Sequence, residues 1–252
     1  MKWLPLLAFA ACAPGVTTQD AGRATFYEDI DQGSCGFGAD HVPYIAAPAE
    51  WMMGQHARVC GAYVQVTSQG AVGPDGDATC ATGDTITFEV TDTCPAQGNE
   101  RWCANPSVAH FDLGAAAFAA LGTPACGVLT GLTWQWVEMP GDAPLRIRSK
   151  EGVNAWWYAF FVLDHRSALA RAEVKDSSGD AWLEARHQSY NAWVVENAKG
   201  GFQPPLSIRL TDLHGQVVTL GNVVTSLAES TEFTTTQQFP AGKGGGDPLS
   251  LP

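Results

Sequence analysis

The cysteines are confined to the first half of the chain, and this distribution constrains the fold more than any other feature. The sequence of 252 residues contains seven cysteines, and the last of them is Cys126. Setting Cys12 aside leaves an even set of six, which an exported protein usually oxidises. The pattern predicts a disulfide-linked first domain and a cysteine-free second domain. Many pairings are possible among Cys35, Cys60, Cys80, Cys94, Cys103 and Cys126.

A zinc site is the alternative use of these cysteines. Zinc sites place cysteines and histidines at short, characteristic spacings. This sequence has no CxxC pair, and its six histidines are scattered. We therefore expect disulfides, and we expect neither a metal nor a cofactor.

The first twelve residues have the pattern of an export signal. Lys2 precedes a short apolar run at residues 3–9, and two alanines then lead to Cys12. This resembles a bacterial lipoprotein signal (residues 1–12), after which the lipidated cysteine becomes residue one. The alternative is a secreted protein cleaved after Ala13. In both cases we expect export, with a lipid anchor as the sole membrane attachment, since no later stretch is long and apolar enough to span a bilayer.

Acidic residues outnumber basic ones. The chain has 26 Asp and Glu against 14 Lys and Arg, which gives a net charge of -12. A strongly negative protein is repelled by nucleic acid and by anionic membrane surfaces. We therefore exclude both as partners and expect a neutral polymer rather than an acidic one.

Short apolar runs between Gly, Pro and Asp turns predict a mainly β fold. In the first half they flank one Ala-rich helix, at residues 114–121, which Gly122 and Pro124 end. Mostly strands with one helix favours a compact closed barrel over residues 21–139. The strands expected there are 23–26, 62–66, 85–90 and 128–137.

The second half has a different pattern. Residues 140–144 contain two prolines and are expected to form a stiff linker. Beyond them, regularly spaced apolar runs predict an immunoglobulin-like β-sandwich over residues 145–238. The Gly-rich end, residues 239–252, predicts a disordered tail. The strands expected in this half are 145–149, 155–165, 169–176, 181–190, 192–197, 207–210 and 216–224.

Two aspartates lie at the ends of expected elements. Asp92 follows the strand at 85–90, and Asp112 precedes the helix. Paired carboxylates suit acid-assisted chemistry at a glycosidic bond, or a firm grip on sugar hydroxyls. The second half supplies Trp156, Trp157 and Tyr190, whose rings can stack on sugars. An acidic groove followed by an aromatic platform indicates a polysaccharide ligand.

Each of these residues also has an ordinary structural explanation. Asp112 can cap the helix that follows it, and Asp92 can be a turn residue. Adjacent strand residues point to opposite faces, so Trp156 and Trp157 can both be exposed only at a bulge or where the chain enters the strand. His110 is expected to support the loop of Asp112 rather than to titrate in a mechanism.

Motifs in both halves resemble those of the expansins. In the first half these are GRATFY (22–27), GSCGF (33–37), VTDTCP (90–95), WC (102–103) and HFDL (110–113). In the second half KEG (150–152), WW (156–157), SYN (189–191) and TDLHGQV (211–217) resemble bacterial expansin-like proteins. Each motif is weak alone, but in order and spacing they cover nearly the whole mature chain.

The resemblance implies a six-stranded double-psi β-barrel, related to family-45 endoglucanases, followed by a cellulose-binding β-sandwich. Asp112 matches the aspartate that is essential for wall loosening, Asp92 a second groove aspartate and Thr25 a groove threonine. The resemblance also implies the disulfide Cys35–Cys60. A bond between Cys94 and Cys103 would close a short loop, and this choice leaves Cys80–Cys126.

Expansins loosen plant-type cell walls without detectable hydrolysis, so the resemblance implies cellulose and associated matrix glycans as partners. The residues that match the family's aromatic platform are Trp156, Trp157 and Tyr190, with Lys150 beside it. The sequence therefore favours an exported, non-hydrolytic, expansin-like protein, which we expect to be a monomer.

Asp29 keeps a hydrolytic alternative open. Residues 25–29 have the T-x-Y-x-D spacing of the endoglucanases, in which the last aspartate is the base, whereas expansins generally lack that base. A weak endoglucanase would use Asp112 as acid and Asp29 as base, although a solvated acidic loop also explains residues 28–31. A third possibility is a cellulose-binding surface adhesin in which the barrel is a spacer.

Overall fold

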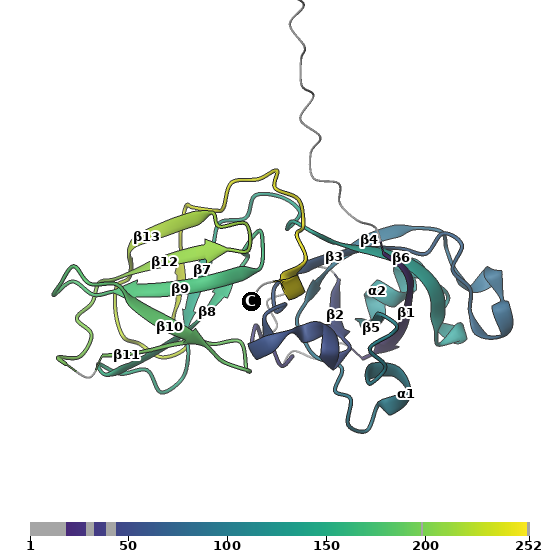
Figure 1. Cartoon of the computed structure of the whole chain (residues 1–252), viewed down its shortest axis with the longest axis horizontal. Helices are drawn as coiled ribbons and strands as arrows, with labels where there is room; N and C mark the ends of the chain where they lie inside the picture. Colours follow the sequence, from purple (N-terminus) through teal and green to yellow (C-terminus); the bar gives the residue numbers. More distant parts are fainter. Residues whose placement is uncertain (1–18, 29–32, 39–43, 198, 251–252) are drawn as a thin grey trace, which may run out of the picture.

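Six strands of the first half close into a barrel in the computed structural model (Figure 1). The structure describes residues 19–28, 33–38, 44–197 and 199–250. Around the barrel the strand order is β1-β5-β2-β4-β3-β6, which confirms the closed barrel expected from the sequence. The strands are Gln19–Tyr27 (β1), Ile45–Pro48 (β2), Tyr63–Thr67 (β3), Thr85–Val90 (β4), His110–Gly114 (β5) and Leu129–Val137 (β6).

Alternating side chains fill the barrel. In β4 the buried apolar residues are Ile86, Phe88 and Val90, with Glu89 also buried, and in β6 the buried residues include Trp134 and Trp136. Successive side chains of a strand point to opposite faces, so this alternation sends one set of apolar residues into the core. The pairs β1–β5 and β2–β4 are parallel, and the other barrel pairs are antiparallel.

Short helices connect the barrel strands. The α-helices are Glu100–Cys103 (α1) and Ala115–Leu121 (α2), and α2 confirms the helix expected at 114–121. Phe118 and other residues of α2 are buried, and Gly122 ends the helix. No helix in the described ranges is long and apolar enough to cross a membrane. The 3-10 turns are Glu50–Met53 (η1), Gln55–Ala57 (η2), Pro74–Gly76 (η3), Ala78–Cys80 (η4), Pro124–Cys126 (η5) and Pro248–Ser250 (η6).

Three disulfides cross-link the barrel half. They join Cys35 to Cys60, Cys80 to Cys126, and Cys94 to Cys103, so the expected pairing is confirmed. The last bond ties α1 to the loop after β4. Cys12 lies outside the described residues, and its lipidation stays a prediction.

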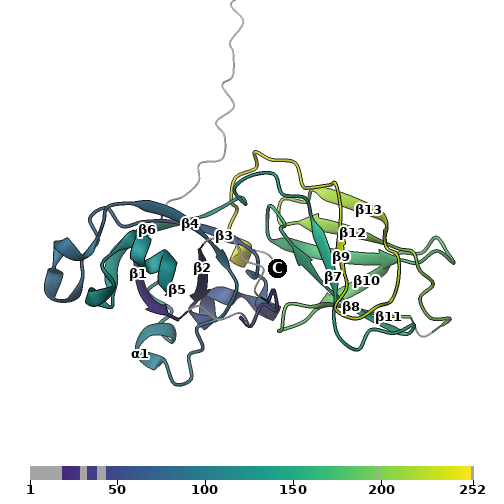
Figure 2. The same cartoon turned by 180° about the vertical axis from the view of Figure 1, so that it is seen from behind.

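The second half forms one eight-stranded sheet in the order β13-β12-β9-β10-β11-β8-β7-β14. All of its strand pairs are antiparallel. Ile147 and Ile208, from strands far apart in this order, belong to one buried cluster, so the sheet bends around a common core (Figure 2). That this is an immunoglobulin-like sandwich stays a prediction. The strands are Arg146–Ser149 (β7), Trp157–Leu163 (β8), Leu169–Lys175 (β9), Leu183–His187 (β10), Trp193–Glu196 (β11), Leu206–Asp212 (β12), Val217–Val224 (β13) and Glu232–Thr234 (β14).

The barrel and the sheet are packed directly against each other. Phe161 of β8 belongs to the same buried cluster as the barrel interior. Arg148 of β7 donates hydrogen bonds to the carbonyl oxygens of Phe37, at 2.9 Å, and of Gly36. A Cβ at Gly36, whose φ is +71°, would lie 2.7 Å from the Phe161 ring, so this contact requires glycine. Division into domains at 21–139 and 145–238, with a linker at 140–144, stays a prediction.

The last described residues return from the sheet to the barrel. In this segment, residues 239–249, which we call the C-terminal strap, Phe239 is buried in the sheet core. The backbone N–H groups of Gly242 and Lys243 donate to the carboxylate of Glu138 at 3.0 and 2.7 Å, and Leu249 packs against the barrel core. The sequence predicts a disordered tail here, but two apolar anchors hold the Gly-rich segment in place.

Candidate functional site

Thr25 and Asp112 are neighbours on adjacent barrel strands. The parallel pair β1–β5 places them side by side in register. The Thr25 hydroxyl donates a hydrogen bond to Oδ1 of Asp112 at 2.6 Å, and its oxygen lies 3.2 Å from Nε2 of His110. His110 and Asp112 are two residues apart in β5, so both point to the side that carries Thr25.

Asp112 is a half-buried carboxyl with a perturbed proton affinity. Burial raises the pKa of Asp112 above its ordinary value of 3.8, the hydrogen bond from Thr25 lowers it, and the negative charge of Asp92 raises it further. The helix-cap explanation fails, because Gly114 is the residue at the cap of α2 and no described side chain caps it. A partly buried carboxyl with a raised pKa is a candidate functional group.

Asp92 organises the loop that follows β4. Its Oδ1 accepts hydrogen bonds from the backbone N–H groups of Ser34 and Thr93, both at 2.8 Å. A Cβ at Gly33 would lie 2.2 Å from the carbonyl oxygen of Thr91, so the approach of the two loops requires glycine. Asp92 is thus a turn residue, which is the ordinary structural explanation given above. Its negative charge also raises the pKa of Asp112.

His110 is buried behind Thr25. Its ring stacks on Trp102, with centroids 5.8 Å apart and an interplanar angle of 20°. The guanidinium of Arg23 lies over the same indole, 5.1 Å from its centroid. Burial, and then the charge of Arg23, lower the pKa of His110 from 6.5 to about 4. His110 is therefore neutral at pH 7.

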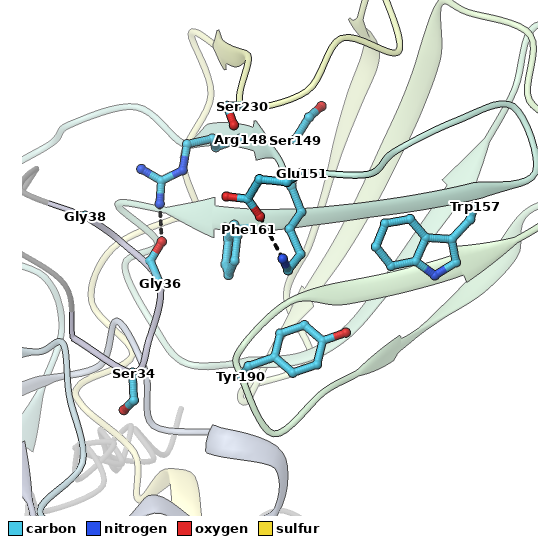
Figure 3. Close-up of a pocket in the computed structure, with 11 residues that line it drawn as sticks. Ser34, Gly36, Gly38, Arg148, Ser149, Glu151, Trp157, Phe161, Tyr190 and Ser230 are labelled. Carbon is cyan, nitrogen blue, oxygen red and sulfur yellow. Dashed lines mark hydrogen bonds and ion pairs between the residues drawn. The ribbon is translucent and has the colours of Figure 1, made fainter.

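A pocket of about 730 Å³ opens where the barrel meets the sheet (Figure 3). Ser34 and Gly36 line it on the barrel side, and the rings of Trp157 and Tyr190 border it on the sheet side. Apolar rings with a few polar groups are typical of ligand sites. The other lining residues are Gly38, Arg148, Ser149, Lys150, Glu151, Phe161 and Ser230.

The predicted aromatic platform is accessible, although its members differ. Trp156 and Tyr190 are 63% and 42% exposed, whereas Trp157 is partly buried against the sheet core. The chain is only entering β8 here, because Oδ1 of Asn154 accepts the N–H groups of both tryptophans, at 2.9 and 3.1 Å. Trp157 and Tyr190 line the pocket together, while Trp156 lies outside its described lining. That the three rings form one coplanar row stays a prediction.

Lys150 lies beside the platform, as the resemblance implies. Its Nζ is 5.8 Å from the ring centroid of Tyr190 and 2.7 Å from Oε2 of Glu151. Both side chains line the pocket, where they can exchange hydrogen bonds with sugar hydroxyls.

Sequence reasoning missed the residues that join the barrel loop to the pocket. Ser34 bonds to Asp92 and also lines the pocket, and Arg148 holds the carbonyl of Gly36 while its guanidinium lies 5.5 Å from the Phe161 centroid. The glycines of the GSCGF motif were the available signal, because closely spaced glycines often mark a close approach of two chain segments. Asp29, the possible base, lies outside the described residues.

Comparison with known proteins agrees with this geometry. A family model described as EXPB1-like domain 1 matches residues 17–119, a range that contains Thr25, Asp92 and Asp112. Expansin-like protein 5 of Dictyostelium discoideum is 26% identical over 235 residues, which cover 91% of this chain and 89% of that protein. These matches make the chain expansin-like in sequence.

Two further relatives of this expansin-like protein are bacterial. Expansin-YoaJ of Bacillus subtilis is 30% identical over 108 residues, or 43% of this chain and 44% of that protein. A solved variant of the Clavibacter michiganensis expansin, in complex with cellohexaose, superposes with a TM-score of 0.69 at 25% identity, covering 90% of this chain and 100% of that chain. The likeness thus extends over the barrel and the sheet together.

Proposed function

We propose that this expansin-like protein is exported, binds cellulose, and loosens plant-type wall polysaccharides without hydrolysing them. The bond from the Ser34 backbone to Asp92, at 2.8 Å, carries the proposal. Because Ser34 also lines the pocket of Trp157 and Tyr190, the acidic groove and the aromatic surface meet at one loop, and a single glycan chain can touch both. The cellohexaose bound to the Clavibacter relative supports a cellulose-type ligand.

Each site residue has a role in this proposal. Trp157 and Tyr190 stack on successive sugar rings, with Trp156 extending the contact and Lys150 bonding hydroxyls. On the barrel side, Asp112 is the principal polar group. Its carboxyl oxygens can form hydrogen bonds with sugar hydroxyls in competition with the hydrogen bonds between glycan chains.

Thr25 and Asp92 hold the glycan next to Asp112 in this scheme. Thr25 donates its hydroxyl hydrogen to Asp112 and leaves its oxygen as an acceptor for a sugar hydroxyl. The carboxylate of Asp92 accepts a hydrogen bond from the backbone N–H of Ser34, a residue that also lines the pocket. No covalent bond of the glycan is broken.

The proposal includes the organisation of the chain. The barrel of residues 21–139 is a double-psi barrel that loosens the wall, and residues 145–238 form an immunoglobulin-like sandwich that binds cellulose. Three disulfides suit an oxidising environment outside the cell. A lipid on Cys12 anchors the monomer at the cell surface, with secretion as the alternative.

One observation favours hydrolysis as the second candidate function. The raised pKa of Asp112 is what a general acid needs, so a weak endoglucanase could pair Asp112 with Asp29 as base. An inverting pair needs carboxyls about 6.5–9.5 Å apart with a water between them. We expect the acidic segment at 28–31 not to hold Asp29 so firmly.

Three measurements on one preparation of the full mature chain test the proposal: cellulose binding, weakening of paper, and release of reducing ends. We expect binding and weakening without sustained release. Asp112→Asn should remove the weakening and leave binding nearly intact, while exposed Asp180→Asn, a matched control on the sheet half, should change neither. Sustained release lost in both Asp112→Asn and Asp29→Asn would establish the endoglucanase, and binding with no weakening in the wild type would establish the adhesin.

A further inference from the structure

His110 is connected to Asp112 through Thr25. The Thr25 hydroxyl has a single hydrogen, and the 2.6 Å bond to Oδ1 of Asp112 uses it. The 3.2 Å contact between the Thr25 oxygen and Nε2 of His110 is then a hydrogen bond only if the histidine donates. The three side chains form a chain of donors that ends on the carboxylate.

The other ring nitrogen supports the same assignment. Nδ1 of His110 is buried and has no hydrogen-bond partner among the described residues. A proton there would be an unsatisfied buried donor and would face the positive charge of Arg23, which already opposes protonation of this ring. A bare lone pair at Nδ1 avoids both costs.

The surroundings of His110 exclude water. The side chain is fully buried, and Trp102 covers one face of the ring. The sulfur atoms of Cys94 and Cys103 lie within 4.8 Å of one of its ring nitrogens. Such a ring cannot exchange protons readily with solvent, so it is poorly placed as a proton source. It is well placed to hold one fixed hydrogen bond.

We propose that His110 is a positioning residue of the groove, which donates its Nε2 hydrogen to Thr25 and thereby commits the hydroxyl hydrogen of Thr25 to Asp112. The inference rests on the proposed function for the role of Asp112 in loosening. Its molecular content, the direction of two hydrogen bonds, can be measured without any wall assay.

The charged groups around this chain of hydrogen bonds act in known directions. Arg23 on β1 disfavours a positive charge on His110. Arg101 on α1 lies 4.5 Å from the Trp102 centroid, on the helix that covers the histidine. Asp92, from the loop after β4, raises the pKa of Asp112 against the effect of Thr25. Without the histidine donor, the hydrogen bond from Thr25 therefore counteracts less of the increase that Asp92 causes in the pKa of Asp112.

The tautomer of His110 gives the first test, on the unmodified full chain. Ring nitrogen chemical shifts should show a neutral ring with hydrogen on Nε2 between about pH 5 and 8. A hydrogen on Nδ1, or protonation of His110 near its ordinary pKa, would overturn the proposal. This measurement does not depend on whether any variant folds.

A double-mutant cycle gives the second test, with the pKa of Asp112 followed by carboxyl NMR. Thr25→Val should raise that pKa by about one unit, and His110→Met by about half a unit, because each removes support for the ionised carboxylate. The double variant should resemble Thr25→Val alone, since His110 acts through Thr25. Additive shifts would show that His110 acts directly or by general packing.

The chain offers a matched control in His187. This histidine is also stacked on a tryptophan, with its ring 4.3 Å from that of Trp193, and burial lowers its pKa to about 4 as well. His187→Met should leave the pKa of Asp112 unchanged, and His110→Gln, which keeps a donor, should restore most of the wild-type value. A shift in His187→Met equal to that in His110→Met would contradict the proposal. If these pKa results hold while paper weakening is absent from the wild type, the proposed function fails and the hydrogen-bond assignment stands.

Discussion

The side-chain amide of Asn191 donates a hydrogen bond to the backbone carbonyl oxygen of Cys35, 3.0 Å away. Asn191 follows Tyr190 in the turn after β10, and Cys35 follows Ser34 in the barrel loop. Both partners are buried. This bond therefore sets the spacing between the aromatic side of the pocket and the barrel loop that lines its other side.

Two replacements of Asn191 distinguish the contribution of its side-chain amide to stability from that of its backbone conformation. Its φ is +63°, so Asn191→Gly keeps an accessible conformation while removing the amide. We expect a loss of about 1–2 kcal/mol in the free energy of unfolding, because the carbonyl of Cys35 and Nε2 of His187 both lose their hydrogen bond to the Asn191 amide. Asn191→Ala should lose about 1 kcal/mol more through the left-handed backbone. Urea denaturation measures both, and a glycine variant as stable as the wild type would show that the bond contributes nothing.

Trp157→Ala combined with Tyr190→Ala should weaken binding to crystalline cellulose at least tenfold. By analogy with stacking on nucleic acid bases, each ring contributes about 1–3 kcal/mol. Stacking is uncharged, so binding by the wild type should persist at high salt. Trp182→Ala is the control, since this tryptophan contacts Arg209 outside the pocket. Depletion assays with cellulose would contradict the platform if the double variant bound like the wild type.

Acid should destabilise the protein before its carboxylates protonate. Burial lowers the pKa of His110 and His187 from 6.5 to about 4, so below pH 6.5 the unfolded chain binds protons that the folded chain refuses. The stability present above pH 6.5 is therefore lost as the pH falls toward 4, by about 2 kcal/mol per histidine at about pH 5. In His187→Gln, the difference in unfolding free energy between about pH 7 and 5 should be smaller than in the wild type by the contribution of one histidine, about 2 kcal/mol. An unchanged difference would show that His187 is not shielded from protonation.

The six cysteines beyond Cys12 should contain no free thiol in the mature protein. Mass spectrometry of unreduced peptides should find the three bonds Cys35–Cys60, Cys80–Cys126 and Cys94–Cys103. Cys12 should react with a thiol reagent only where it carries no lipid. A metal that survives dialysis and is released by modifying these cysteines would contradict the disulfide assignment.

The sequence predicted those parts of the fold that a repeating pattern encodes. The short apolar run of β4 and the Ala-rich run of α2 are local patterns, and the structure confirms the strand and the helix expected from them. Some short strands lacked a sufficient signal: β2 is all apolar, and β5 alternates in its HFDL motif but has only five residues. Their strand character comes from pairing with distant segments, which local patterns do not encode.

The sequence identified candidate site residues one by one, but it did not predict how they are arranged in space. The aspartates and aromatic residues stand out by type and motif. Their connection depends on Ser34, whose backbone N–H bonds to Asp92 within the barrel half, and on Arg148, whose bond crosses from the sheet half to the barrel loop. Side chains of these types are common on surfaces, so only the glycines that flank Ser34 gave a signal, and Arg148 had none. The sequence also did not identify Phe239 and Leu249 as the apolar anchors of the C-terminal strap, because the glycines between them are typical of a disordered tail.

The C-terminal strap gives the chain a second crossing between its two halves. The chain leaves the barrel through residues 140–144, and Leu249 brings it back to the barrel core. A protein whose halves share one tether falls apart when a protease cuts that tether. Here a nick at 140–144 would leave the sheet latched to the barrel by the strap and by Arg148. A single protease cut there would therefore leave the two halves together, and the single glycan chain that we propose could still contact both.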